Sequence, residues 1–347
     1  MRVLFCFGDG HWPRVKGGLQ TATHDLCLAL QQAGASPAVL CGLPADADGQ
    51  PAPVHTPTEH DTSLGYPVFR SADPVRDLPL LAAAWEPTAL VVQSGGRGFI
   101  DMTAAALTAG KPTAVYLHNV ELASAGGWMA ASPEVLVLAN SAFTAQRWHA
   151  LLGLHAHVVP PVVNAAACLA GLDAREKVLF VNPAPVKGVH LALALAGACP
   201  DIPFTFVHSW PLQSQWASQV AARVAALGNV VLLDAVDDMR PLYAQTRLLL
   251  MPSVWEEAFG RTVVEAQING IPALASDRGA LPQVVGAAGL VRSPHAPLAD
   301  WVLALRTMYA DPSPWQAAAK RQGLLHAAQT PLIAAELLGL LAAHASR

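Results

Sequence analysis

Charged residues are scarce in this chain of 347 residues: only 13% are Asp, Glu, Lys or Arg, and the formal net charge is −4. No block of Lys or Arg recurs along the sequence, which argues against nucleic acid as a partner. The five cysteines are odd in number and include no C-x-x-C pair. We therefore expect buried free thiols and a reducing, cytoplasmic environment.

Long hydrophobic runs are also missing, although 53% of the residues are hydrophobic. The longest apolar stretches are residues 191–199 and the tail from Leu332, which Glu336 interrupts. Neither approaches the roughly 18 to 20 residues that a membrane span needs. The first seven residues have neither a long apolar core nor a cleavage site, so they predict a strand and not a signal peptide. We expect no transmembrane segment, and we assign the apolar residues to packed cores.

Short apolar runs alternate with helical patterns along most of the chain, which is typical of an α/β protein with parallel sheets covered on both faces. The expected strands are residues 3–7, 37–41, 89–93, 113–117, 135–139, 177–181, 204–208, 230–233, 248–251 and 273–276. The expected helices between them are residues 18–32, 101–109, 143–152, 189–198, 213–227, 241–244 and 261–269.

The alternation stops and restarts near residues 159–173, where Pro160 and Pro161 stiffen the chain. We predict two Rossmann-like, doubly wound domains, residues 1–165 and 166–312, facing a central cleft. From about Pro297 the pattern is purely helical. We expect residues 313–347 to form helices that pack back toward the first domain, because the end of the chain is apolar nearly all round.

A nicotinamide or flavin fingerprint is absent from both halves. After the first strand, residues 8–13 read G-D-G-H-W-P, with Pro13 where the third glycine of G-x-G-x-x-G belongs. The first strand of the second half leads into Asn182 and Pro183, without a glycine turn. These two departures argue against a dehydrogenase.

Gly17 and Gly18 stand just before the first long helix. Glycines at a helix start let backbone N–H groups approach an anion, which the helix dipole favours. Arg14 and Lys16 add positive charge nearby. An ordinary flexible loop that ends in a helix cap is the alternative interpretation.

The segment from Pro252 to Ala266 carries the strongest signal. A strand runs into an acidic loop with Glu257, then Gly260, then a helix that holds Glu265. Ligands of open α/β sheets bind at such carboxyl ends of strands, and the N–H groups of the helix start could hold a diphosphate. By spacing alone, both glutamates could equally be solvated surface carboxylates.

Residues 251–289 resemble the nucleotide-sugar site of retaining glycosyltransferases of family four, which have the GT-B fold. Glu257 and Glu265 match that family's E-x7-E pattern, and Asn269 to Ser276 and Gly279 to Gly286 resemble its next strand and loop. Gln283 stands where the family more often has Glu. Weaker matches extend over the whole chain: Gly17-Gly18, residues 116–119, residues 139–141 and Lys187-Gly188.

The resemblance implies a retaining transfer of a sugar from a nucleoside-diphosphate donor to an acceptor hydroxyl, with Glu257 holding the donor sugar. It implies that Glu265 binds the ribose and that Lys187 neutralises the diphosphate. Backbone N–H groups of Phe259, Gly260, Arg261 and Thr262 would help to place sugar and phosphates. From the first domain, Gly17 and Gly18 would let the helix start approach the diphosphate, and His118 would reach the donor sugar. His118 could instead be a satisfied histidine at a strand end.

One departure from the family concerns the diphosphate. The family usually has Gly-Arg-Leu ahead of the Lys-Gly pair, and here Asn182 stands in place of the arginine. A guanidinium is a bidentate, permanently charged partner for phosphate, so its loss matters. Either Asn182 suffices beside Lys187, or another cation such as Arg261 or Arg14 contributes.

No metal or cofactor is expected, because in GT-B enzymes basic residues and helix ends stabilise the leaving group. Asp46 and Asp48 form a D-x-D, but in a loop rich in Pro and Gly, and His155 and His157 lack a third ligand nearby in sequence. The acceptor, a carbohydrate or glycolipid in polysaccharide or lipopolysaccharide synthesis, implies at most peripheral contact with the inner face of a membrane. Trp12 and Trp128 could stack on a sugar or simply pack.

Other functions stay open at this point. A non-catalytic subunit that binds a sugar nucleotide within a synthetic complex would keep the same fold, as would a phosphorylase or an epimerase. The presence of both Glu257 and Glu265 favours a transferase.

Overall fold

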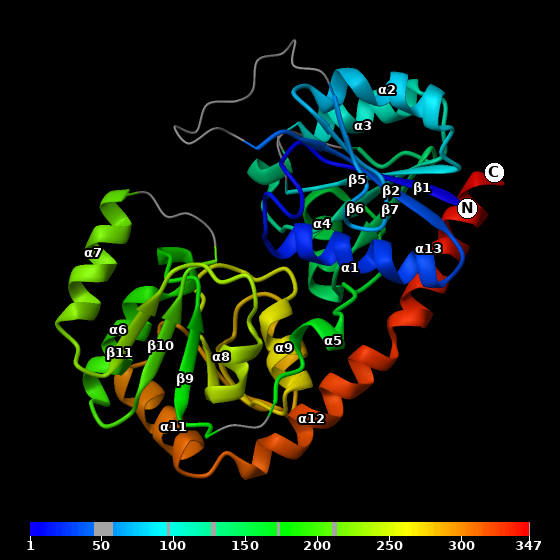
Figure 1. Ribbon diagram of the computed structural model, residues 1–347. Helices are drawn as coiled ribbons and strands as arrows, with labels where there is room; N and C mark the ends of the chain where they lie inside the picture. The colour runs from blue at the N-terminus through cyan, green and yellow to red at the C-terminus, as the bar shows by residue number, and fades with distance from the viewer. Residues whose placement is uncertain (45–57, 96–97, 126–129, 172–173, 210–213, 347) are drawn as a thin grey trace. The chain divides into compact units, whose positions relative to one another are not determined.

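The computed structural model describes residues 1–44, 58–95, 98–125, 130–171, 174–209 and 214–346. The chain forms two compact units (Figure 1). Unit 1 is Met1–Val162 together with Gln329–Arg347, and unit 2 is Val163–Ala328. The division therefore falls after Val162 and not after residue 165, within the proline-containing stretch that predicted it.

Unit 1 contains an eight-stranded sheet with the order β3-β4-β2-β1-β5-β6-β7-β8. All neighbouring strands are parallel except β3 and β4. The strands are β1 (Arg2–Cys6), β2 (Ser36–Gly42), β3 (Glu59–Asp61), β4 (Val68–Ser71), β5 (Ala89–Gln93), β6 (Thr113–Leu117), β7 (Val135–Ala139) and β8 (His157–Val158). The helices are α1 (Gly18–Gln32), α2 (Pro74–Trp85), α3 (Phe99–Thr108), η1 (Leu122–Ala125), α4 (Ala142–Leu152) and α13 (Thr330–Ala345).

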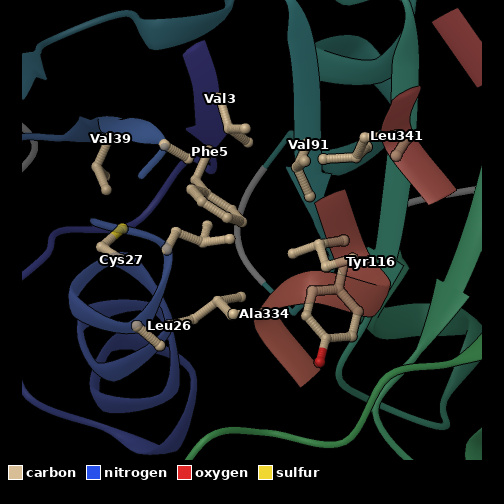
Figure 2. Close-up of a cluster of buried hydrophobic side chains, with 14 of the residues drawn as sticks. Val3, Phe5, Leu26, Cys27, Val39, Val91, Tyr116, Ala334 and Leu341 are labelled. Carbon is tan, nitrogen blue, oxygen red and sulfur yellow. The ribbon is translucent and has the colours of Figure 1, made fainter. Parts of the chain in front are cut away.

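Side chains of β1 point alternately to two cores, as the pleat of a strand requires. Val3 and Phe5 join a core beneath α1 and α13, whereas Leu4 and Cys6 join one that includes side chains of α2, α3 and α4. Figure 2 shows the first core, in which Ala334 and Leu341 of α13 lie near the sheet residues Tyr116 and Val91. Helix α13 is therefore an integral layer of unit 1.

Unit 2 contains a six-stranded, all-parallel sheet with the order β11-β10-β9-β12-β13-β14. The strands are β9 (Lys177–Val181), β10 (Phe204–Val207), β11 (Val230–Leu233), β12 (Thr246–Met251), β13 (Ala273–Ser276) and β14 (Gly289–Arg292). The helices are α5 (Ala165–Cys168), η2 (Pro185–Lys187), α6 (Val189–Ala198), α7 (Ser214–Ala225), α8 (Arg240–Gln245), α9 (Arg261–Ile268), α10 (Leu281–Val285), α11 (Leu298–Ala310) and α12 (Ser313–Ala328).

Two cores cover the two faces of this sheet as well. One contains apolar side chains of α6, α7 and α11, with Trp301 fully buried. The other contains side chains of α5, α8, α9 and α10, with Tyr243 fully buried. The near-continuous apolar runs of the strands follow from burial on both faces.

The C-terminal segment differs from the expectation, because the structure divides residues 313–347 between the units. Helix α12 belongs to unit 2 and packs on α9. Gly323 makes this approach possible, since a Cβ there would lie 2.2 Å from the backbone nitrogen of Ile268. Only α13 joins the first unit.

Among the described residues, no single helix has both the length and the apolar composition to cross a membrane. Helices α12 and α13, which break at Gln329, meet those two criteria only when they are counted together.

Candidate functional site

In unit 2, the strand order reverses direction between β9 and β12. Strand β9 is followed in the chain by β10 on one side, whereas its other neighbour, β12, comes later. Loops diverge at such a switch point and leave room for a ligand at the carboxyl ends of the strands. Lys187 lies in η2, which follows β9, and Glu257 lies in the loop that follows β12. The topology therefore brings these two predicted residues to one place.

Glycines let the backbones of the site loops approach closely. A Cβ on Gly188 would lie 2.0 Å from the carbonyl oxygen of Pro252, and a Cβ on Gly279 would lie 2.1 Å from that of Glu257. Both glycines have positive φ, +82° and +63°, which other residues adopt at a cost. Backbone hydrogen bonds join the same loops, from the N–H of Val254 to Val186 (3.0 Å) and from that of Ala280 to Glu257 (2.8 Å).

An ion pair lies at the centre of these loops. The ammonium of Lys187 is 2.7 Å from Oε1 of Glu257, and the hydroxyl of Ser253 donates to the same oxygen at 2.6 Å. Glu257 is only 6% exposed and Ser253 is fully buried. The ammonium also lies 5.7 Å from the ring centre of Trp255. A buried carboxylate held by a cation and a hydroxyl keeps one defined orientation.

A second carboxylate lies on α9. Gly260, with φ +99°, precedes the helix, and Glu265 lies about one turn into it. Nε of Arg261 is 2.8 Å from one oxygen of Glu265, and the Tyr243 hydroxyl donates to the other at 2.6 Å. The first turn of α9 contains no acidic residue, so its N–H groups and dipole favour an anion.

Asn182, which replaces the family's usual arginine, is 2% exposed and has φ +65°. Asparagine tolerates this left-handed conformation better than most residues. Neither Nδ2 nor Oδ1 of its amide has a hydrogen-bond partner among the described residues, although buried amides are nearly always paired. Of the two cations considered as substitutes, Arg261 pairs with Glu265, and Arg14, in unit 1, pairs with Glu59 at 2.7 Å.

The remaining predicted residues of unit 2 flank the start of α9. Phe259 is half-buried, and its ring centre lies 5.8 Å from that of His326 on α12. Thr262 is half-buried in the first turn.

In unit 1, His118 follows β6 and lies against the ring of Tyr116, with 4.1 Å between ring centres. Its Nε2 is buried and has no partner among the described residues. Burial lowers the pKa of the imidazole to about 3, so the ring is neutral at physiological pH. The backbone N–H of His118 donates to the hydroxyl of Ser94 (2.9 Å), at the end of β5.

Gly17 and Gly18 form the start of α1. Gly17 is extended, a conformation open to any residue, and a Cβ on it would touch only the side chain of Gln20. A Cβ on Gly18 would meet no described atom within 4 Å. The packing within unit 1 therefore does not by itself require glycine at position 18.

A buried polar cluster in the loop after β1 was missed by the sequence analysis. The Tyr66 hydroxyl lies 2.9 Å from a ring nitrogen of His11 and 2.9 Å from one of His24. The fully buried guanidinium of Arg70 bonds to the backbone carbonyls of His11 and Trp12. The sequence pattern did not indicate this cluster, because its contacts join residues that are far apart in the chain.

Ser253 and Tyr243 were also missed in unit 2. Ser253 lies directly after the strand end that was singled out, so its position could have indicated a site residue. Tyr243 lies on the short helix α8, and only the three-dimensional contact with Glu265 reveals it.

Other residues that were considered fall outside this site. The ring of Trp12 stacks on His24, with 4.9 Å between centres, and lies beneath the Lys16 ammonium. Asp46, Asp48 and Trp128 lie outside the described residues. Within the described ranges, no group of three or more His, Cys, Asp or Glu side chains is arranged to hold a metal ion.

Sequence profiles of two known groups match the two units in turn. One, described as Glycosyltransferase Family 4, matches residues 16–167, and one described as Glycosyl transferases group 1 matches residues 176–311. The chain belongs to glycosyltransferase family 4. The two glutamates singled out in the sequence, Glu257 and Glu265, lie within the second match.

Two curated relatives of this family 4 chain match it over short segments. The O-antigen chain mannosyltransferase B of Escherichia coli is 37% identical over 93 residues, 27% of this chain and 24% of that protein. The D-inositol 3-phosphate glycosyltransferase of Corynebacterium kroppenstedtii is 35% identical over 77 residues, 22% of this chain and 17% of that protein. The matched segments thus span less than a quarter of the length of these relatives.

Solved structures share the GT-B fold over nearly the whole chain. HepE of Anabaena, in complex with UDP, superimposes with a TM-score of 0.76 at 17% identity and covers 99% of this chain and 100% of its own. The same protein has been solved in complex with UDP-glucose.

Proposed function

We propose that this protein is a retaining glycosyltransferase that moves a sugar from a nucleoside diphosphate to an acceptor hydroxyl in glycan synthesis. The observation that carries the proposal is the buried Lys187–Glu257 pair at the switch point, beside the start of α9. The complexes of HepE with UDP and UDP-glucose and the likeness to a mannosyltransferase support a nucleotide-sugar donor.

Each charged group has a distinct role in this proposal. The ammonium of Lys187 and the N–H groups at the start of α9 neutralise the departing diphosphate. Glu265 accepts hydrogen bonds from the ribose, and Glu257 holds the donor sugar near its reacting carbon. In unit 1, the neutral imidazole of His118 is the group that we expect to reach the donor sugar.

The transfer breaks the bond between the anomeric carbon and the diphosphate oxygen, which keeps the electron pair. The acceptor oxygen then bonds to the same face of the anomeric carbon, and its proton passes to a phosphate oxygen of the leaving group. We favour this same-face displacement, through an oxocarbenium-like state, over a covalent intermediate. We expect no divalent ion to be required, so activity should survive EDTA.

The first experiment compares Glu257→Gln with its neighbour Glu256→Gln as a matched control. Glu257→Gln keeps the shape and removes the buried charge, so turnover should fall about 100-fold. Glu256→Gln should stay near the wild type. Release of nucleoside diphosphate from UDP-, GDP- and ADP-sugars measures both turnover with acceptor and slow donor hydrolysis without it. Near wild-type turnover of Glu257→Gln would contradict the assignment.

The same assay separates the transferase from a non-catalytic binding subunit. A binding subunit would be stabilised by a nucleotide sugar in thermal unfolding but would release no diphosphate. A transferase both binds the donor and hydrolyses it slowly in the absence of acceptor.

We further propose that the enzyme works at an anionic membrane surface, through the exposed face of α12. This helix contains no acidic residue. Its residues Ala317, Lys320, Arg321, Leu324 and Leu325 line a surface hollow of about 470 Å³. Leu324 and Leu325 are 52% and 58% exposed. Leucines flanked by cations fit the interface of an anionic bilayer.

Co-sedimentation with vesicles tests this surface. The wild type should bind vesicles that contain phosphatidylglycerol and not vesicles of phosphatidylcholine alone. The double variant Leu324→Ser/Leu325→Ser should lose this binding, whereas Leu303→Ser, which alters a leucine on α11 that is 69% exposed, should keep it. A wild type that binds neither kind of vesicle would contradict the membrane proposal and leave the transferase proposal intact.

A further inference from the structure

Tyr243 is buried in unit 2, and its hydroxyl donates to Glu265, one of the two carboxylates of the E-x7-E pattern. The Tyr243 side chain is 0% exposed, and its hydroxyl lies 2.6 Å from Oε2 of Glu265. Burial, together with the negative charge of Glu265, raises the pKa of this phenol well above its usual value. The phenol therefore stays protonated and acts as a permanent donor.

The opposite oxygen of Glu265 is held from the helix itself. Nε of Arg261 lies 2.8 Å from Oε1, and the Glu265 side chain is 16% exposed. With one donor on each oxygen, the plane of the carboxylate is fixed. An ionised carboxylate has about four acceptor positions, so one position on each oxygen is left for a ligand. Two acceptors side by side and fixed in orientation suit two neighbouring hydroxyl groups.

We infer that Tyr243 is a positioning residue that fixes the carboxylate of Glu265 for the vicinal diol of a ribose. This inference rests on the proposed function, in which Glu265 meets the ribose of the donor. Tyr243 does not touch the ligand. It makes the enzyme discriminate a ribonucleotide from a 2′-deoxyribonucleotide, because only the ribonucleotide uses both oxygens of the oriented carboxylate.

The test measures Kd by calorimetry for UDP, GDP and ADP and for their 2′-deoxy counterparts, and continues with the base that binds best. The wild type should bind the 2′-deoxy nucleotide about tenfold more weakly than the ribonucleotide. In Tyr243→Phe, which keeps the ring and removes the hydroxyl, this ratio should fall to about threefold. With the matching nucleotide sugar, the donor KM should rise while kcat changes little.

Tyr309→Phe is the matched control, because Tyr309 also lies in unit 2 and its hydroxyl donates to a backbone carbonyl, that of Glu176, at 2.8 Å. In Tyr309→Phe, the ratio of Kd for the 2′-deoxy nucleotide to Kd for the ribonucleotide should equal that of the wild type. In the Glu265→Gln background, Tyr243→Phe should change the ratio no further, since both residues act through one carboxylate. A merely structural role for the phenol would move the thermal midpoint and leave the ratio unchanged.

The outcomes separate the two claims. A wild type that binds none of the six nucleotides overturns the proposed function and this inference with it. A wild type that discriminates ribose, with an unchanged ratio in Tyr243→Phe, overturns only the role of Tyr243. A crystal structure of the wild type with the nucleotide gives an independent reading: a ribose that contacts neither oxygen of Glu265 also overturns the inference.

Discussion

In unit 1, the loop that follows β1 is held by polar side chains that bond to one another and to the loop backbone. His11, Tyr66, His24 and Arg70 form this cluster, and His11 and Arg70 are fully buried. In unit 2, the loops that follow β9 and β12 are held by glycine-mediated backbone contacts, and their charged side chains gather at the switch point.

The difference separates two uses of polar groups in a pair of similar sheets. In unit 1, where side chains hold the loop, their hydrogen bonds stabilise the fold. Where backbone contacts hold the loop, the charged side chains Lys187 and Glu257 pair with each other at the strand ends, where we propose that the donor binds. Substitutions in the side-chain cluster of unit 1 should therefore change stability, and substitutions in the loops of unit 2 should change turnover and nucleotide binding.

The largest expected effect comes from Gly279→Ala in unit 2. A Cβ there would lie 2.1 Å from the carbonyl oxygen of Glu257, so the loop that carries this carboxylate must move. Because misplacement by about 1 Å can cost roughly 100-fold in rate, turnover should fall by that amount or more. Nucleoside diphosphate release at saturating donor measures it.

Gly110→Ala is the control for backbone strain alone. Gly110, in unit 1, has φ +66°, close to that of Gly279, and nothing described lies within 4 Å of its would-be Cβ. The Gly110→Ala variant should be about 1 kcal/mol less stable, because alanine adopts the left-handed conformation at a cost. Its turnover should equal that of the wild type. If Gly110→Ala and Gly279→Ala lost equal turnover, backbone strain alone would explain the effect, and the close approach of the site loops would not matter.

The next effect concerns Asn182 in unit 2. Asn182→Asp keeps a residue that tolerates the positive φ but places a negative charge at the position where the family usually has an arginine for the diphosphate, so Kd for the nucleoside diphosphate should rise about tenfold or more. Asn182→Gly keeps the backbone and removes only the amide, and Kd should rise about threefold. Calorimetry measures Kd for both variants. Kd values equal to that of the wild type would place the diphosphate away from Asn182.

Much of the fold could be predicted from the sequence because parallel strands buried on both faces are apolar runs with clear ends. Strands β5, β6, β7, β9, β11 and β13 have the predicted bounds. The strands β3, β4 and β14 were missed, as were the helices α2, α5 and α10. Strand β3 is Glu-His-Asp at a sheet edge, and α2 contains Pro79. Edge pairing and a proline within a helix both weaken the periodic signal.

The site could be predicted only in part. The E-x7-E pattern located Glu257 and Glu265 because their spacing is local. The pairing of Lys187 with Glu257, 70 residues apart, depends on β9 and β12 being neighbours. Sequence alone placed each residue at a strand end but did not specify which strands adjoin. Tyr243 was not predicted for the same reason, because its partner Glu265 is 22 residues away.

A smaller effect, on stability and not on turnover, should follow from Tyr66→Phe in unit 1. The variant removes the hydroxyl that joins His11 and His24 and should destabilise the protein by roughly 1 to 3 kcal/mol. Urea unfolding measures this loss, and nucleoside diphosphate affinity should equal that of the wild type. A tenfold loss of affinity with unchanged stability would show that the cluster serves a ligand after all.

The last expected effect is a pH dependence that His118 gives to the stability of unit 1. Burial lowers the pKa of its imidazole to about 3 in the folded protein, from 6.5 in the unfolded chain. Between these values the unfolded state binds a proton that the folded state does not. The stabilisation is therefore complete above about pH 6.5 and is lost as the pH falls toward 3, at about 1.4 kcal/mol per pH unit. His118→Gln should reduce the slope of unfolding free energy between pH 6 and pH 4 by that amount. A slope in His118→Gln that equals that of the wild type would mean that the His118 ring takes up its proton without unfolding.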